Sequence, residues 1–360
     1  MCFQILLLKS QVKYNLGGRL FIDGGSFIAS PNNFNSGISI TDLRLTGKVA
    51  LENDWSVKLD VGFAYNNVSL KDAFIQKING HKHLFRLGYM IGMFSLDQSS
   101  STNDYLFLTG ANVAETFYPG RRIGIAYTYF SPCYYISVGA FCGDGLNFQK
   151  TIKQGFNFTL RGVYRPIIKD DKLLHFGIGG LFRHPDRNIE TNERTVVFRS
   201  RGVTYQNVPY ILDECIKDVN TEFQYNIEMI GHCGKFFFQA EYLQMYINSM
   251  IGIKYKAKGG YAEGGLFLLG KNFKYDVMDA MQICPNEVNS LALFGRFSYT
   301  DLDDIVWKGG NQYDVSLGMN YYLNKNIIFR INYSYLWTNK NAAVPSETWN
   351  MLQTRVQIKF

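Results

Sequence analysis

The strongest constraint on the fold is a strict alternation of apolar and polar side chains over residues 348–360. One face carries Leu352, Thr354, Val356, Ile358 and Phe360, and the other carries Gln353, Arg355, Gln357 and Lys359. Successive side chains of a β-strand point to opposite faces, so this period of two predicts a strand with one apolar and one polar, basic face. Either a sheet in water or a sheet with lipid on one side would produce this pattern.

The same alternation occurs in a long internal hairpin. Residues 38–51 place leucine and valine on one face and Asp42, Arg44 and Lys48 on the other. After the turn 52–54, residues 55–65 alternate again from Trp55 to Tyr65. About eleven residues suffice for a tilted strand to cross a bilayer, and aromatic side chains gather at both membrane interfaces. Trp55 and Tyr65 are therefore expected at the two interfaces.

Segments of this kind recur along the whole chain. Strands are expected at 14–28, 38–51, 55–65, 71–78, 84–92, 121–130, 134–142, 156–165, 172–183, 222–231, 235–247, 258–269, 290–300, 311–323, 326–337 and 348–360. An even number, about sixteen, allows an antiparallel barrel to close with both termini at the same end.

The connections between these segments alternate in length. Short turns are expected at 52–54, 131–133, 232–234 and 324–325, and long loops at 93–120, 143–155, 184–221 and 338–347. Short periplasmic turns and longer extracellular loops are typical of outer-membrane barrels. The segment 270–289 is an exception, because it is long on the short-turn side, and we expect it to fold into the lumen.

The composition favours a membrane barrel over a sheet protein in water. Aromatic residues make up 16% of the chain and charged residues 19%, and no run of about 18 apolar residues forms a candidate transmembrane helix. An all-β protein in water would have to leave many Tyr and Phe side chains on exposed faces. We therefore predict an all-β transmembrane antiparallel β-barrel of about 16 strands, forming a single domain over residues 14–360. Residues 1–13 are either the remnant of an export signal or the mature N-terminus.

Several segments together resemble the phosphate-selective porin O and P family. They are LRLTGKVALENDWSVKLDVGFAYNNVSLKDAFIQ (43–76), FRLGYMIGMFSLDQ (85–98), YPGRRIGIAY (118–127), FQAEYL (238–243), GGYAEGGLFLLG (259–270) and, within 295–337, GRFSYTDLDD and GGNQYDVSLGMNYYLNKNIIFRINYSYLW. The resemblance implies a sixteen-stranded barrel of the bacterial outer membrane, usually a homotrimer, that passes small anions by diffusion. It also implies pore arginines that guide phosphate in some members. The loop 93–120 departs from that pattern, because it contains no arginine cluster before Arg121.

If the apolar face meets lipid, the other face lines the lumen. The candidate pore-lining and anion-binding residues are Arg44, Lys48, Lys58, Arg86, Arg122, Arg161, Arg296, Arg330 and Arg355. Arginine keeps its charge at any working pH and can bind two oxygens of a phosphate or carboxylate at once. The alternative is that these residues pair with lumenal carboxylates, such as Asp42 and Glu228, and only fill a polar wall.

The loop 93–120 is a candidate for the constriction. If it folds into the lumen, its acidic residues Asp97, Asp104 and Glu115 would face the basic wall and create a transverse field. The alternative is a plain surface loop. Phe360 is the candidate signal for the barrel assembly machinery, since barrel-closing strands often end on phenylalanine.

Signals for enzymatic chemistry are poor. The sequence contains no GxSxG, P-loop or HExxH motif, and the pair His81 and His83 has no evident third metal ligand. No cofactor or metal is expected. The net charge of +7 is not concentrated in a Lys/Arg-rich run, so no nucleic-acid partner is expected. The sequence predicts a passive porin for small hydrophilic solutes, with anions preferred and phosphate-like anions included. The alternative is a barrel plugged by its loops that binds partners without conducting.

Overall fold

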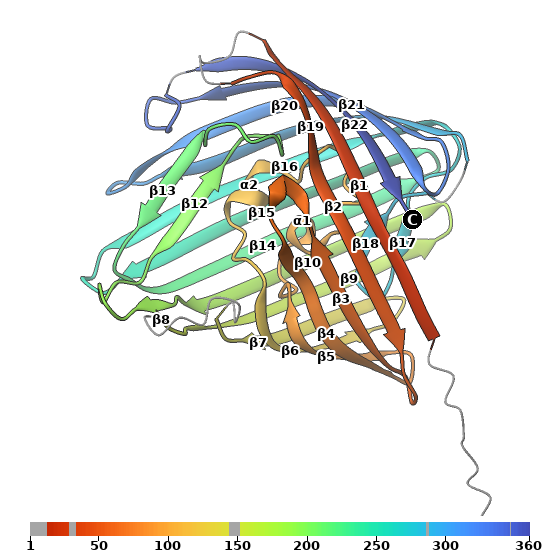
Figure 1. Cartoon of the computed structure of the whole chain (residues 1–360), viewed down its shortest axis with the longest axis horizontal. Coiled ribbons are helices and arrows are strands. Elements are labelled where there is room, and N and C mark those ends of the chain that lie inside the picture. The colour runs from red at the N-terminus through yellow and green to blue at the C-terminus, as the bar shows by residue number, and fades with distance from the viewer. Residues whose placement is uncertain (1–12, 29–33, 144–151, 286–287, 346) are drawn as a thin grey trace, which may run out of the picture.

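Sixteen antiparallel strands close into one barrel, as Figure 1 shows. The computed structural model describes residues 13–28, 34–143, 152–285, 288–345 and 347–360. The first eight barrel strands are β1 (Lys13–Ile28), β2 (Gly37–Ala50), β3 (Trp55–Gly62), β4 (Ser69–Asn79), β5 (His83–Met90), β6 (Arg122–Phe130), β7 (Tyr134–Phe141) and β9 (Phe156–Lys169). The remaining eight are β10 (Lys172–His184), β14 (Val219–Cys233), β15 (Phe236–Ser249), β16 (Lys254–Leu269), β19 (Ser290–Asp303), β20 (Lys308–Tyr322), β21 (Ile327–Thr338) and β22 (Thr348–Lys359). The predicted fold class and strand number are confirmed.

The last strand closes the barrel against the first. β22 pairs with β1 from Arg19↔Lys359 to Ile28↔Asn350. The backbone of Phe360 extends the seam, because the Gly18 N–H donates to its carbonyl oxygen at 2.9 Å and its own N–H donates to Gly18 O at 3.1 Å. A Cβ at Gly18 would lie 2.5 Å from Arg44 O, so only glycine fits at this point. Closure pairs both edges of every one of the sixteen barrel strands.

The barrel is apolar outside and polar inside. On β22, Arg355 is 1% exposed whereas Leu352 is 40% exposed. This distribution is the reverse of that in a protein surrounded by water, and it is typical of a barrel in the outer membrane. No helix among the described residues is long and apolar enough to cross a membrane.

One strand is shorter than its sequence pattern suggests. β3 ends at Gly62, and a 3-10 turn, η1 (Ala64–Asn66), follows with positive φ at Tyr65 and Asn66. Tyr65 was expected at the membrane interface at the end of a strand over 55–65, and this was wrong. Its hydroxyl instead donates to Tyr205 O, on the segment between residues 184 and 219.

Three connecting segments fill much of the lumen. The β5–β6 segment contains α1 (Leu96–Ser99) and α2 (Asn112–Thr116), which lie inside the barrel outline in Figure 1. The β10–β14 segment contains the hairpin β12 (Val196–Ser200) and β13 (Leu212–Ile216), and the β16–β19 segment contains β17 (Lys274–Asp276) and β18 (Met281–Ile283). A further short pair is β8 (Ile152–Lys153) with β11 (Arg187–Asn188). The main apolar cluster joins α2 and β12 to the strand wall through Val113, Phe117, Phe198, Leu243 and Tyr255.

The first twelve residues lie outside the described part of the chain, so the interpretation of 1–13 as an export-signal remnant or mature N-terminus stays a prediction. The barrel begins at Lys13.

Candidate functional site

The β5–β6 segment crosses the lumen because the far wall supplies donors to its backbone. Arg330 donates to the carbonyl oxygens of Phe107 and Asn103, each at 3.1 Å, and to Tyr105 O. Arg296 donates to Thr109 O at 3.2 Å. A loop without regular structure must satisfy its carbonyl groups when it is buried, and these arginines do so. The loop therefore packs against β19–β21 and leaves the open space on the opposite side.

A short helix helps to shape this loop. Ser95 precedes α1 in an extended conformation and accepts a hydrogen bond from the Gln98 N–H, which is the usual N-cap arrangement. The Glu241 carboxylate, from β15, accepts from the N–H groups of Leu96 and Asp97 at 3.0 and 3.2 Å. The helix start is thus fixed to the strand wall.

The open space is a cavity of about 1150 Å3 between this loop and the wall made by β1–β5. Among the described residues that line it, ten carry basic side chains and six carry carboxylates. The basic residues are Arg19, Arg44, Lys48, Lys58, Lys71, Arg86, Arg121, Arg199, Arg201 and Lys359. The acidic residues are Asp42, Asp60, Asp72, Asp97, Glu115 and Asp279.

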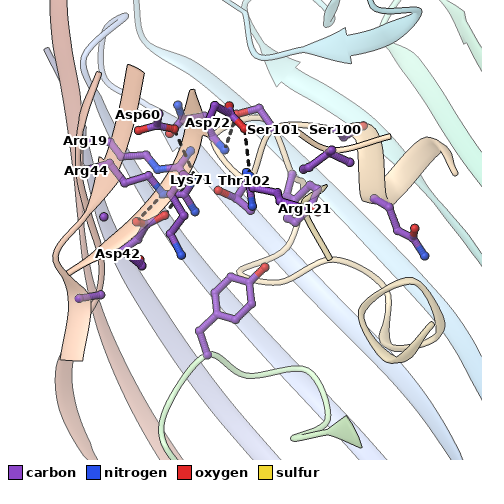
Figure 2. Close-up of a pocket in the computed structure, with 18 of the residues that line it drawn as sticks. Arg19, Asp42, Arg44, Asp60, Lys71, Asp72, Ser100, Ser101, Thr102 and Arg121 are labelled. Atoms are coloured by element: carbon purple, nitrogen blue, oxygen red, sulfur yellow. Dashed lines mark hydrogen bonds and ion pairs between the residues drawn. The ribbon is translucent and has the colours of Figure 1, made fainter. Parts of the chain in front are cut away.

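The wall side of the cavity is a ladder of alternating charges. Asp42 lies between Arg19, at 2.6 Å, and Arg44, at 2.9 Å, and Arg44 also approaches Asp60 at 3.6 Å. Figure 2 shows these side chains gathered on the strand wall around Lys71. Each carboxylate thus holds an arginine in place while leaving part of its guanidinium toward the cavity.

A third carboxylate, Asp72, orients two further cations. Asp72 accepts from Lys58 Nζ at 2.6 Å and from Arg121 Nε at 3.0 Å. Lys48 and Lys71 also line the cavity, and no ion pair joins either of them to another described residue. These two lysines therefore add positive charge to the cavity wall.

The β10–β14 segment forms another side of the cavity. The Tyr205 hydroxyl donates to Glu115 at 2.7 Å, which connects this segment to α2. The guanidinium of Arg201 lies 4.1 Å from the ring centroid of Tyr210, and that of Arg199 lies 5.1 Å from it. Both arginines are held over an aromatic face at the edge of the cavity.

The β16–β19 segment folds into the lumen, as its length on the short-turn side indicated. Arg161 donates to the carbonyl oxygens of Asp279 and Ala280 at 3.2 and 2.9 Å, and Arg86 pairs with the Asp279 carboxylate at 3.0 Å. Arg161 is itself fixed by Glu228 at 2.7 Å, with both side chains fully buried. The segment forms one end of the cavity, where Asp279 and Met281 line it.

The three acidic residues predicted for the constriction lie on the inward loop, but in different surroundings. Burial raises the pKa of the Asp97 carboxyl to about 7, although Arg296 and a hydrogen bond from the Ala111 N–H oppose the shift. Burial also raises the pKa of Glu115. Asp104 does not line the cavity, since its carboxylate accepts from the Cys284 N–H at 2.9 Å and connects the loop to the β16–β19 segment.

The structure separates the nine predicted basic residues into two groups. Arg44, Lys48, Lys58 and Arg86 line the cavity. The other five are at most 8% exposed and hold neighbouring protein groups: Arg122 approaches Asp186, Arg161 binds Glu228, Arg296 and Arg330 bind loop carbonyls, and Arg355 binds Asp23. The inward-folded segments need donors for their backbone, and Arg161, Arg296 and Arg330 supply them. The role of the first group in anion binding stays a prediction.

The predicted set omitted six basic residues of the cavity: Arg19, Lys71, Arg121, Arg199, Arg201 and Lys359. The alternation over 14–28 would have placed Arg19 on the face of Phe21 and Asp23, which are both buried inside. Lys71 lies beside a register shift between β3 and β4, which obscures its face in the sequence. Arg199 and Arg201 reach the cavity only because their segment folds inward, and no local pattern signals this.

A closed barrel with an apolar outer face, a lumen narrowed by an inward loop and a charged cavity wall defines the class: the chain is a porin of the bacterial outer membrane. The model of the family described as phosphate-selective porin O and P matches residues 15–360. The chain belongs to that family, and the resemblance found in the sequence is confirmed.

Individual relatives are more distant. A protein of Caulobacter vibrioides described as uncharacterized is 24% identical over 337 residues, which are 89% of this chain and 67% of the relative. An anion-selective porin from Comamonas acidovorans is 12% identical, with a TM-score of 0.63 over 97% of this chain and 100% of that chain. OmpT of Vibrio cholerae in its trimer form is 11% identical, with a TM-score of 0.63 over 97% of this chain and 99% of that chain. At these identities the two structures show the fold alone.

Proposed function

We propose that this porin is a passive channel with a preference for anions over cations, phosphate-like anions included. The observation that carries the proposal is the excess of basic over acidic side chains around the cavity, ten against six among the described residues. A narrow, low-dielectric passage with an excess of one charge concentrates the opposite ion and lowers the cost of removing its water. The name of the family and that of the Comamonas porin agree with this preference.

The arrangement of the cations supports diffusion rather than tight capture. Arg19, Arg44 and Arg121 are each bonded to a carboxylate, so a passing anion competes with an existing partner. Conduction requires sites that attract an ion but also release it. Lys48 and Lys71, which have no ion pair within the described part of the chain, supply the additional attraction.

A second candidate function is a barrel that binds partners without conducting. The three inward segments favour it, because they bury much of the lumenal wall: Arg161, Arg330 and Arg355 are at most 2% exposed. The cavity beside β1–β5 favours the channel.

Solute flux into liposomes distinguishes the two candidates. We expect purified protein to admit chloride and phosphate faster than the potassium counter-ion, and to admit a small sugar as well. The absence of any flux from correctly folded protein would favour the plugged barrel. No catalytic step is part of the proposal, and it requires no cofactor.

We further propose that the protein assembles as a homotrimer through the wall that contains β3, β5, β6 and β7. These strands have 8, 8, 9 and 8 residues, while the eight barrel strands from β9 to β22 each have at least 12. A strand needs about 9–11 residues to cross the hydrocarbon core of the membrane. Most strands of this wall are shorter than that, and we call it the low wall. A neighbouring subunit would cover it. Phe360, paired with Gly18 at the seam, is proposed as the residue that the barrel assembly machinery recognises.

A further inference from the structure

One barrel strand carries a file of cations on its outer face. On β16, Tyr255 and Ala257 are buried on the inner side, and the alternate residues Lys254, Lys256 and Lys258 are exposed on the outer side. Because successive strands alternate in direction, the β15–β16 turn lies at the same end of the barrel as the long β5–β6 and β10–β14 segments. Long connections mark the extracellular end. The three lysines therefore lie at the extracellular rim.

The neighbouring side chains locate the membrane surface on this strand. Tyr242 and Tyr299 pair with Gly260 from the two adjacent strands, and aromatic girdles mark the edge of the hydrocarbon. From this point toward the periplasm the outward residues of β16 are apolar: Gly260, Ala262, Gly264 and Leu266. β16 has 16 residues, and about 9–11 of them suffice to cross the hydrocarbon. Residues 254–258 therefore extend into the headgroup layer of the outer leaflet.

The lysines of this file have few partners within the protein. Lys258 approaches the Asp301 carboxylate at 4.0 Å, and its side chain is still 51% exposed. No ion pair joins Lys254 or Lys256 to another described residue. Lys256 Nζ lies 5.9 Å from the ring centroid of Tyr246. A lysine that faces the lipid side of a barrel is costly unless it reaches polar groups at the interface, so this file requires anions in the headgroup layer.

The other carboxylates near the β19–β20 turn are engaged by the protein's own donors. Asp303 accepts from the side-chain amides of Asn339 and Asn341 at 2.6 and 2.9 Å. Asp304 accepts from the backbone N–H of Lys256 at 3.0 Å. The ammonium groups of the file thus remain available to a ligand from the lipid side.

We propose that residues 254–258 of β16 bind a phosphorylated glycolipid of the lipid A type, with its phosphates on the lysines and its acyl chains along the apolar face below Gly260. Lys254 and Lys258 are about 13 Å apart along the strand. Lipid A carries a phosphate at each end of a disaccharide, so one headgroup can meet both ends of the file. A phospholipid with a single phosphate meets one end.

Two further observations agree with this ligand. Asn248 pairs with Lys254 across the strands, and its exposed side chain donates to Thr221 Oγ1 at 3.2 Å, so polar groups for a sugar lie beside the lysines. In the order of the barrel strands, β16 lies nearly opposite the low wall. The proposed trimer would therefore leave this face to lipid.

The test is titration of the purified protein in detergent with diphosphoryl lipid A, with the bound lipid counted by native mass spectrometry. Monophosphoryl lipid A and phosphatidylglycerol are the comparison lipids. We expect the half-saturating concentration of diphosphoryl lipid A to be about tenfold lower than that of phosphatidylglycerol, with the monophosphoryl form between them. Binding should weaken as the salt concentration rises.

A triple variant assigns the binding to the file. Lys254→Gln, Lys256→Gln and Lys258→Gln together should raise the half-saturating concentration of diphosphoryl lipid A by about tenfold or more, since each lysine near an anionic headgroup adds to the attraction. The matched control replaces three exposed lysines at the opposite rim, Lys169, Lys172 and Lys235, by glutamine. It removes the same charge and should bind like the parent. A strand-rich circular dichroism spectrum from each variant shows that it has folded.

Three outcomes would overturn the site. They are unchanged binding by the β16 variant, an equal loss in the control, and phosphatidylglycerol bound as tightly as diphosphoryl lipid A. None of these readings depends on ion selectivity, so failure of the lipid site and failure of the proposed channel function are distinguishable.

Discussion

Asp97 is a residue of the cavity lining whose charge should change near neutral pH. It lines the cavity, and burial raises the pKa of its carboxyl to about 7. Below that pH the carboxyl is mostly neutral, and above it the carboxylate adds negative charge to the constriction. A negative charge in the passage repels anions, so the anion preference should decrease as the pH rises through neutrality.

The corresponding prediction concerns Asp97→Asn. In the parent, the permeability ratio of chloride to potassium should fall between about pH 6 and about pH 8. In the variant this change should be smaller, because the amide stays neutral over that range. Reversal potentials at the two pH values check it.

Asp54→Asn is the control, since Asp54 lies in the exposed β2–β3 turn away from the cavity. Its pH response should equal that of the parent. An equal pH response of Asp97→Asn and the parent would contradict the role assigned to Asp97.

Among the elements, the inward β16–β19 segment is held in part by one buried ion pair. Arg161 and Glu228 are fully buried, and the His175 Nε2 lies 3.0 Å from the same Glu228 oxygen. Arg161 uses its remaining hydrogens on Asp279 O and Ala280 O. Removal of Glu228 would leave a buried positive charge without its partner and would loosen the segment that this charge holds.

We predict that Glu228→Ala lowers the free energy of unfolding by about 3–5 kcal/mol. Lys217→Ala breaks the exposed pair between Lys217 and Glu193 and should cost only about 0–1 kcal/mol. Thermal unfolding in detergent, followed by circular dichroism, measures both. Equal losses for the two variants would show that the buried pair does not stabilise the barrel.

The elements also show what could be predicted from sequence. A period of two is a local property, so the strands and their number followed from the chain itself. Tyr65 was misplaced because the turn at Ala64–Asn66 ends β3 early, and its apolar neighbours continue the alternation past that point. The division between Arg44, which lines the cavity, and Arg330, which binds loop carbonyls, depends on where distant loops fold. The period of two assigns both to the lumen and cannot separate them.

For the whole molecule, the low wall should behave differently from the rest of the barrel. Leu87 on β5 and Ile227 on β14 both point outward, with 55% and 56% of their surface exposed. A subunit neighbour would cover Leu87, and lipid would cover Ile227. A tryptophan would overpack a subunit contact, whereas lipid tails can rearrange around it.

We therefore predict that Leu87→Trp shifts the protein from trimer toward monomer and that Ile227→Trp does not. Size-exclusion chromatography with light scattering in detergent measures the assembly. Trimers of undiminished stability in Leu87→Trp would place the subunit contact elsewhere, and a monomeric parent protein would contradict the trimer.

The account as a whole depends on the excess of positive charge that lines the cavity beside β1–β5. The most direct measurement is the reversal potential of single channels between two KCl solutions of different concentration, for the parent and for Lys71→Glu with Lys48→Glu. The reversal potential of the parent should lie on the side of the chloride equilibrium potential. That of the double variant should shift toward the potassium equilibrium potential. A parent potential near zero or of the potassium sign would contradict the account.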